Sequence, residues 1–405
     1  MSESGWKPRV NIGVVGHVDH GKSTLVKALT GVWTARHSEE IKRGMTIKLG
    51  FANAYFYRCP NCGNYGVSEV CKVCGSKTEF VRSVSFVDSP GHEVLMARML
   101  SGAAVMDGAM LVIAANESCP QPQTREHFTA LDVLGIRNLV IVQNKVDVVT
   151  RERAIESYRE IAKMVAGTWA ENAPIIPLSA LRELNISELI QALIQRVPLP
   201  ERDPNKRFRM YVIRSFDVNK PGTPPEGLRG GVIGGSVVSG ALRLGEEVEV
   251  LPGFKDSNNR FVPLAATVLS MKSDSLTLDV ADPGGLIGIE TDLDPAVAKA
   301  DSLAGCIVGK AGDLPKPTVE IQVEARVFQR VVGTKELMNL GPLKAGEQVV
   351  VTIGPAITTA MVKSYKSGAL ELRLSRPVIA ERGDKVAVSR KVLEKWRLSG
   401  YGTVK

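Results

Sequence analysis

The segment Gly16–Ser23 constrains the fold of this chain more than any other. It reads Gly-His-Val-Asp-His-Gly-Lys-Ser and fits the phosphate-loop pattern G-x-x-x-x-G-K-[ST] in full. The run Val10–Val15, rich in β-branched residues, precedes it, and the helical pattern Ser23–Leu29 follows it. This strand–loop–helix context separates a true phosphate loop from an ordinary glycine turn. The segment therefore predicts an α/β domain that binds a nucleotide through its phosphates.

The chemistry of this loop suits a phosphate chain that carries Mg²⁺. Its glycines allow backbone N–H groups to turn inward, and the start of the following helix adds positive potential. Lys22 can reach the β- and γ-phosphates, and the hydroxyl of Ser23 can bind Mg²⁺. The predicted nucleotide-binding residues of the loop are Val18, Asp19, His20, Gly21, Lys22, Ser23 and Thr24.

A second polar segment, Asp88–His92, follows the predicted strand Ser83–Val87. An acidic residue at the carboxyl end of a strand can hold the Mg²⁺ shell, directly or through water, which is the role predicted for Asp88. Gly91 can offer its N–H to a γ-phosphate because it has no side chain in the way. His92 is the predicted catalytic residue, since its imidazole could orient the attacking water.

Two further segments predict that the base is guanine. In Asn144-Lys145-Val146-Asp147, which follows the strand Leu139–Gln143, a carboxylate such as Asp147 can accept two N–H bonds from the guanine edge. Adenine cannot supply that pair, and a site built to hydrogen-bond a group rejects analogues that lack it. Asn144 and Lys145 would hold the base and the loop. Backbone groups of Ser179, Ala180 and Leu181 would lie near the base, so the four segments together predict GTP and GDP as ligands.

The first half of the chain alternates strand and helix patterns. Nearly continuous apolar strands are typical of a sheet that is buried on both faces. This alternation predicts a doubly wound, mostly parallel α/β domain of the phosphate-loop type. In addition to the strands named above, we predict a strand at Ala109–Ala114. The predicted helices are Thr124–Leu134, Arg151–Val165 and Ile186–Arg196.

The second half of the chain predicts two β-barrels. Three prolines between Pro198 and Pro204 form a stiff connector, and short strand patterns follow it. A second break at Asp313–Pro317 precedes another set of strands. The predicted domains are 1–204, 205–316 and 317–405. The predicted strands are Arg209–Phe216, Gly231–Val238, Glu246–Leu251, Ala265–Met271, Gly285–Glu290 and Cys306–Val308, then Val319–Phe328, Gln348–Ile353, Thr358–Ser364, Ala369–Leu374 and Lys385–Arg390.

Four of the six cysteines form a compact metal-binding pattern. Cys59-Pro60-Asn61-Cys62 and Cys71-Lys72-Val73-Cys74 give C-x₂-C…C-x₂-C with eight residues between the pairs. Four thiolates can close a tetrahedral Zn²⁺ site and leave no position open for water, so we predict a structural zinc knuckle in an insertion near 56–80. A redox pair or unliganded thiols are the alternative.

Composition narrows the remaining possibilities. The chain has 23% charged and 44% hydrophobic residues and a net charge of +8, which fits a globular protein and is compatible with RNA binding. It contains no long uncharged apolar run, so we expect no membrane span and no membrane partner. The polar segment Met1–Arg9 lacks the apolar core of a secretory signal, so we expect a cytoplasmic protein. His37 and His127 are predicted to lie on the surface, and Cys119 and Cys306 to fill the core.

Together these motifs resemble those of the translational GTPases. His17-Val18-Asp19-His20 inside the phosphate loop and Asp88–His92 are both characteristic, and Arg43-Gly44-Met45-Thr46-Ile47 is similar to the first switch segment. The resemblance implies that Thr46 binds Mg²⁺ in the GTP state, and it adds Gly44 and Asp19 to Ser23 and Asp88 in the magnesium set. A hydrogen bond that orders the loop is the alternative role of Asp19.

The cysteine insertion further resembles the gamma subunits of archaeal and eukaryotic translation initiation factor 2, and the similarity covers nearly the whole chain. It implies a heterotrimer with alpha and beta subunits that brings methionylated initiator tRNA to the small ribosomal subunit and its mRNA complex. It also implies a GTPase, and we expect slow hydrolysis without stimulation because no arginine finger can be assigned from the sequence. An elongator-type or selenocysteine-specific tRNA carrier is the nearest alternative, and a scaffold that binds GTP without hydrolysing it is another.

Overall fold

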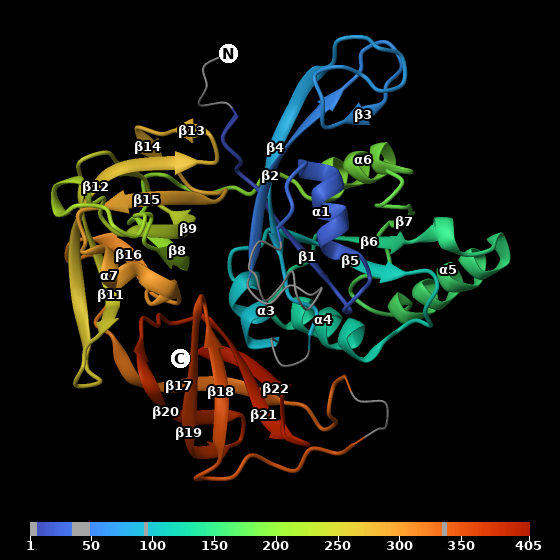
Figure 1. The fold of residues 1–405 in the computed structure, drawn as a ribbon. Helices are drawn as coiled ribbons and strands as arrows, with labels where there is room; N and C mark the ends of the chain where they lie inside the picture. Colours follow the sequence, from blue (N-terminus) through green and yellow to red (C-terminus); the bar gives the residue numbers. More distant parts are fainter. Residues whose placement is uncertain (1–5, 35–48, 93–95, 334–337) are drawn as a thin grey trace.

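The computed structural model describes residues 6–34, 49–92, 96–333 and 338–405, which form an α/β domain and two barrels (Figure 1). The predictions that fall on His37, Gly44 and Thr46 lie outside the described residues. Among the residues that are described, no helix is both long and apolar enough to cross a membrane.

The α/β domain is built on a seven-stranded sheet with the order β3-β2-β4-β1-β5-β6-β7. Its centre is parallel and fully buried, as the apolar runs predicted, but β2 and β3 pair antiparallel, so the sheet is mixed. The strands are β1 (Asn11–Gly16), β2 (Gly50–Arg58), β3 (Tyr65–Gly66), β4 (Glu79–Asp88), β5 (Gly108–Ala114), β6 (Leu139–Asn144) and β7 (Ile175–Pro177).

Helices cover both faces of this sheet. One apolar cluster packs α3, α4 and α5 against it through residues such as Met99, Leu131 and Ile161, and a second packs α1 and α6 through Leu25 and Leu189. This confirms the doubly wound arrangement. The helices are α1 (Lys22–Thr30), α3 (Met96–Ala103), α4 (Pro122–Val133), α5 (Arg151–Val165) and α6 (Ile186–Arg196), with the short 3₁₀ helix η3 (Val146–Val148).

The second domain is a six-stranded barrel that the β11–β12 pairing closes. Alternate residues of its strands, such as Met210 and Val212, fill the interior. Its strands are β8 (Arg209–Phe216), β9 (Val232–Ser239), β11 (Glu247–Lys255), β12 (Phe261–Ser273), β15 (Ile287–Thr291) and β16 (Ile307–Lys310). Smaller elements are β10 (Leu242–Arg243), β13 (Leu276–Thr277), β14 (Val280–Ala281), α7 (Pro295–Ala298), η4 (Pro225–Gly227) and η5 (Lys299–Asp301).

The third domain is a closed barrel with the order β17-β20-β19-β18-β21-β22. The prediction of two barrels is therefore confirmed, although β22 was not predicted. The strands are β17 (Thr318–Val327), β18 (Gln348–Ile353), β19 (Ala356–Lys366), β20 (Ala369–Val378), β21 (Lys385–Val392) and β22 (Lys395–Val404). The domain boundaries near 204 and 316 stay predictions; the first strands after them start at Arg209 and Thr318.

Polar contacts join the three domains. The α/β domain holds the second domain through the ion pair of Lys7 with Asp282, whose Nζ–Oδ1 distance is 2.5 Å. It holds the third through α3, where the hydroxyl of Ser101 donates to the carbonyl of Pro355 at 2.7 Å. Because Lys7 and Ser101 are buried, these contacts are shielded from water and can fix the positions of the domains.

Candidate nucleotide-binding site

The phosphate loop connects the end of β1 to the start of α1, as predicted. Gly16 has φ 140°, and a Cβ atom there would lie 2.3 Å from the carbonyl oxygen of Val112 on β5. Gly21, the residue before α1, has φ 86°, and a Cβ atom there would lie 2.4 Å from Nδ2 of Asn144. Both positions therefore require glycine, because a side chain would meet both a positive φ and a close neighbour.

Lys22 lies in the centre of the loop with its ammonium group buried. Its Nζ donates to the carbonyl of His17 at 2.6 Å. Burial lowers the pKa of Lys22 to about 8, and the charges of Asp88 and Asp19 oppose this shift. An anion beside this ammonium group would replace the solvation that burial removes, which is compatible with the phosphate contact predicted for Lys22.

Oxygen ligands suited to Mg²⁺ converge beside the loop. The Ser23 hydroxyl donates to Oδ2 of Asp88 at 2.6 Å, and the Thr34 hydroxyl donates to the same oxygen at 2.7 Å. Asp88 is fully buried at the end of β4, where it lies beside Val14 of β1. Hydroxyl and carboxylate oxygens are the ligands that Mg²⁺ prefers, so the residues fit this ion. Nothing in the sequence singled out Thr34, which lies in a segment without a motif.

Asp19 is exposed and has φ 61°. Its carboxylate lies near enough to Lys22 to raise the pKa of that residue. The two alternatives for Asp19, a metal ligand and a loop-ordering group, therefore both stay open.

Gly91 brings the second polar segment against the phosphate loop. A Cβ atom at this position would lie 2.5 Å from Nζ of Lys22 and 2.9 Å from the backbone nitrogen of Val18. The segment can approach this closely only because residue 91 is glycine. His92 follows it, half-buried. Its catalytic role stays a prediction.

The two segments predicted to bind the base are joined by hydrogen bonds. Nδ2 of Asn144 donates to the carbonyl of His20 at 2.9 Å, and Oδ1 of Asn144 accepts from the amide of Ala180 at 3.0 Å. Asn144 thus ties the phosphate loop to the Ser179–Leu181 segment. Lys145 has φ 63°, and Asp147 on η3 keeps its side chain 19% exposed, with Nε of Arg182 at 4.0 Å.

The prediction that His127 lies on the surface is wrong. It is buried on α4, where its Nδ1 accepts the backbone N–H of Gly16 at 2.8 Å. Burial lowers the pKa of His127 to about 3 and that of His20 to about 4. The prediction followed from the exposure that is typical of histidine, but this side of α4 lies against the phosphate loop.

The buried imidazole of His127 predicts acid sensitivity. In the unfolded chain its pKa returns to about 6.5, so below that pH the unfolded state binds more protons and stability falls with pH. Between pH 7 and pH 5 this residue should remove about 2 kcal/mol from the free energy of unfolding. Urea denaturation of wild type and His127→Asn at both pH values measures the difference. An equal acid-induced loss in both proteins would contradict it.

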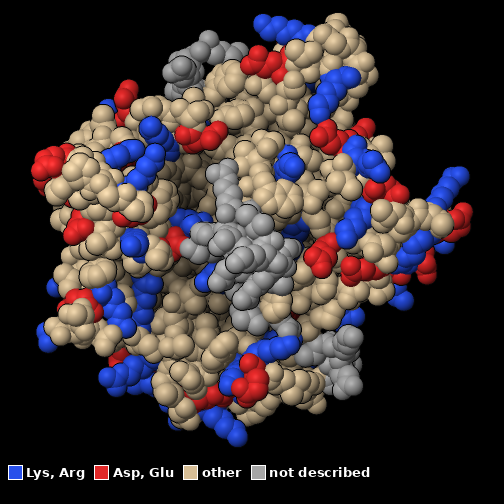
Figure 2. Space-filling model, in the orientation of Figure 1, with Lys and Arg blue, Asp and Glu red and all other residues tan. Residues whose placement is uncertain are grey.

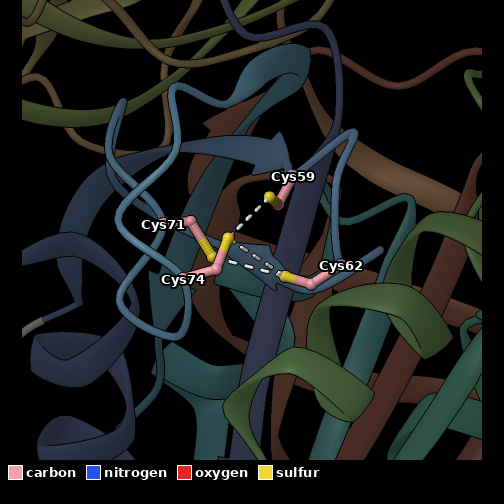
Figure 3. Close-up of side chains that lie close together, drawn as sticks. All are labelled: Cys59, Cys62, Cys71 and Cys74. Carbon is pink, nitrogen blue, oxygen red and sulfur yellow. Dashed lines mark hydrogen bonds between the residues drawn. The ribbon is translucent and has the colours of Figure 1, made fainter.

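The four cysteine side chains of the knuckle point toward one another (Figure 3). The Sγ–Sγ distances are 3.4 Å for Cys59–Cys74, 3.5 Å for Cys62–Cys71 and 3.7 Å for Cys62–Cys74. Tetrahedral thiolates at about 2.3 Å from zinc would lie about 3.8 Å apart, so the cluster fits this ion.

The knuckle has two similar turns. Gly63 donates its amide to the carbonyl of Cys59, and Gly75 donates to Cys71, both at 2.9 Å. Each glycine has φ above 70°, as a turn that wraps a metal requires. The knuckle rests on the start of α6, where the Ser187 hydroxyl accepts the amide of Tyr65 at 3.0 Å.

Two family comparisons match the two ends of the chain. Residues 7–199 match the family described as Elongation factor Tu GTP binding domain, and residues 319–404 match Initiation factor eIF2 gamma, C terminal. Among solved structures, a bacterial selenocysteine-specific elongation factor EF-Sec shares 25% identity at a TM-score of 0.75, covering 98% of this chain and 58% of that one. Elongation factor SelB from Methanococcus maripaludis, at 22% identity and TM-score 0.71, shares the fold over 99% of this chain and 79% of its own.

Relatives of much higher identity are similar over nearly their whole length. The translation initiation factor 2 subunit gamma of Pyrococcus horikoshii is 52% identical over 399 residues, which cover 98% of this chain and 97% of the relative. The protein of the same name from Archaeoglobus fulgidus is 53% identical over 401 residues, covering 98% and 95%. The chain therefore belongs to the family of translation initiation factor 2 gamma subunits, and it is a GTP-binding translational GTPase.

Proposed function

We propose that this subunit, in its GTP state, carries methionylated initiator tRNA to the small ribosomal subunit and its mRNA complex, and that it leaves after GTP hydrolysis. The observation that supports this most is the identity of 52% with named gamma subunits over 98% of the chain. As in the family, it would act in the cytoplasm in a heterotrimer with alpha and beta subunits.

We assign the chemistry at the phosphates to positioning and charge. Lys22 would neutralise the β- and γ-phosphates, and Mg²⁺ would be held by Ser23 and Asp88, with Thr46, Gly44 and Asp19 as the further candidates. When bound, the metal would neutralise charge that develops on the phosphate oxygens. His92 would orient the attacking water once the ribosome or a partner has arranged it, which accounts for slow hydrolysis without stimulation.

A cavity at the boundary of the α/β and second domains offers a place for the methionyl end of the tRNA. Its volume is about 210 Å³, and it is lined by one ring from each domain, Phe51 and Phe216, and by two cations of the second domain, Arg214 and Lys272. Apolar walls suit a methionine side chain, and the cations suit the phosphates next to it. Lysines and arginines also gather on the margins of the two barrels in Figure 2.

Filter binding in the presence of GTP tests the proposal. Wild type should retain methionylated initiator tRNA more tightly than elongator or selenocysteinyl tRNA. Phe216→Ala should weaken that binding without changing the affinity for GDP. Leu269→Ala, which removes an exposed side chain of the same barrel outside the cavity, is the control. A preference for elongator or selenocysteinyl tRNA would favour the alternative carrier instead.

We also propose that the knuckle binds one structural Zn²⁺. Protein purified without chelator should contain about one zinc per chain, and chelation should open the segment between 58 and 80 to proteases, because the ion replaces a hydrophobic core there. Cys62→Ser should have the same effect and Cys119→Ser should not. The absence of zinc from fresh, folded protein would refute this assignment and leave the redox-pair reading.

A further inference from the structure

Helix α4 contacts two distant parts of the molecule with two consecutive side chains. His127 faces the phosphate loop, and Glu126 faces the third domain. Figure 1 shows α4 between the central sheet and the barrel that contains β22. The chemistry described so far uses neither residue.

The contact of His127 is with the backbone of the phosphate loop itself. Its Nδ1 accepts the amide of Gly16, the residue at which β1 ends and the loop begins. A nitrogen that accepts cannot carry a proton, so the imidazole is neutral and its proton lies on Nε2. Lys22, His17 and His20 all disfavour a positive charge on His127, which keeps Nδ1 available as an acceptor.

The contact of Glu126 is a buried ion pair with the third domain. Nη1 of Arg397 on β22 donates to Oε1 of Glu126 at 2.7 Å, and the two side chains are 9% and 1% exposed. A Cβ atom at Gly333, also in the third domain, would lie 2.2 Å from Cγ of Glu126. The third domain therefore encloses this carboxylate closely. Removing one partner of such a pair leaves an uncompensated buried charge, so in the docked protein the position of Glu126 depends on Arg397.

We propose that His127 is a positioning residue for guanine-nucleotide binding, and that the third domain holds it in place through the Glu126–Arg397 ion pair. A helix is rigid over two adjacent residues, so a shift of Glu126 must also move Nδ1 of His127. Gly16, the first residue of the phosphate loop, then either loses its hydrogen bond to Nδ1 or moves together with His127. Such coupling is reciprocal: bound nucleotide must also favour the docked third domain. The inference goes beyond the proposed tRNA function and depends only on guanine-nucleotide binding.

The first experiment separates the hydrogen bond from the packing at residue 127. Asn places an acceptor oxygen where His127 has Nδ1, whereas Leu fills similar space without an acceptor. His127→Leu should release a fluorescent GDP analogue about tenfold faster than wild type, because the Gly16 amide loses a buried partner. His127→Asn should restore most of the wild-type rate. Equal release rates for both folded variants would overturn the positioning role.

The second experiment tests the link to the third domain. Arg397→Gln should speed GDP release about fivefold or more, the usual lower bound for coupled sites. Glu381→Gln is the matched control, since it breaks an ion pair of the third domain with Arg209, away from α4, and should leave release unchanged. In Arg397→Gln, His127→Leu should add little further effect. Wild-type release from folded Arg397→Gln would overturn the link.

A third measurement needs no variant and so does not depend on the folding of Arg397→Gln. Saturating GDP should slow hydrogen exchange in wild type at residues 396–399 of β22 more than at residues 365–369, the β19–β20 turn of the same barrel. Protection of the phosphate loop confirms that GDP is bound. Protection of that loop without any at 396–399 would overturn the coupling.

Discussion

Lys22→Met is expected to abolish tight binding of GDP and GTP while raising the stability of the nucleotide-free protein. Truncating one partner of a buried, hydrogen-bonded charge pair typically costs about 2–5 kcal/mol of binding energy, or about 30-fold or more in affinity. Lys22 would contact the β-phosphate of GDP and the β- and γ-phosphates of GTP. Burial of Lys22 lowers its pKa from 10.5 to about 8. Below pH 8 the folded protein therefore carries a buried charged ammonium group, which lowers its free energy of unfolding. Methionine has a similar length and no charge, so the substitution removes this cost of about 3 kcal/mol.

Thermal unfolding with and without GDP measures both effects together. Wild type should gain stability when GDP is added, whereas Lys22→Met should start higher and gain nothing. Lys27→Met is the matched control, because Lys27 lies on the same helix, exposed, with its ammonium group over the ring of Trp33. A variant that still responds to GDP like wild type would contradict the role of Lys22.

The sequence predicted the parts of the site that depend on local chain geometry. Parallel strands of one sheet bring their carboxyl ends to the same edge. The carboxyl ends of β1, β4 and β6 carry the phosphate loop, the segment with Asp88 and Gly91, and the Asn144 segment, so these three parts meet there. The cysteine pairs were predictable for the same reason, since each knuckle is a turn of a few residues. Asn144 makes hydrogen bonds to His20 of the phosphate loop and to Ala180, so the structure brings these predicted site segments together. The roles of the residues stay predictions.

Contacts between distant segments could not be predicted in this way. His127 stands between Glu126 and Phe128 in the sequence, and only the position of α4 against the loop explains why it is buried. Thr34 reaches Asp88 across 54 residues without a motif. In both residues a polar group binds a partner that a single sequence does not specify.

The strands β2 and β22 were not predicted because their sequences lack the usual alternation of apolar and polar residues, and only the elements packed against them explain this. In β2 the small residues Ala52 and Ala54 face inward, whereas the aromatic Phe51 and Tyr55 are half-exposed, the reverse of the usual alternation. Trp6 lies 5.9 Å from the ring of Tyr55 and helps to cover that face. In β22 the buried position 397 is an arginine whose partner lies on α4. Helix α5, in contrast, begins and ends where its periodicity predicted.

Asp147→Asn is expected to change the base that the protein prefers. Its carboxylate would accept both N–H groups on one edge of guanine, and an amide can accept only one of them. Xanthine carries a carbonyl where guanine has its amino group, so the amide N–H of asparagine gains a partner. A site that loses or gains such a partner commonly discriminates by about 10⁴. We therefore expect GDP affinity to fall at least about 100-fold and xanthosine diphosphate affinity to rise, which competition against a fluorescent nucleotide measures.

The surroundings of Asp147 indicate that Asp147→Asn changes base recognition without changing stability. Asp147 lies on η3 with its side chain 19% exposed, and the cation paired with it, Arg182, is 75% exposed at an Nε–Oδ2 distance of 4.0 Å. A pair so open to water contributes little to stability, so Asp147→Asn should fold as wild type does. Asp132→Asn, which removes an exposed carboxylate of the same domain outside the site, should leave base preference unchanged. If Asp147→Asn kept the wild-type preference for GDP over xanthosine diphosphate, the base would have to be read by other groups, and the assignment of Asn144–Asp147 would be wrong.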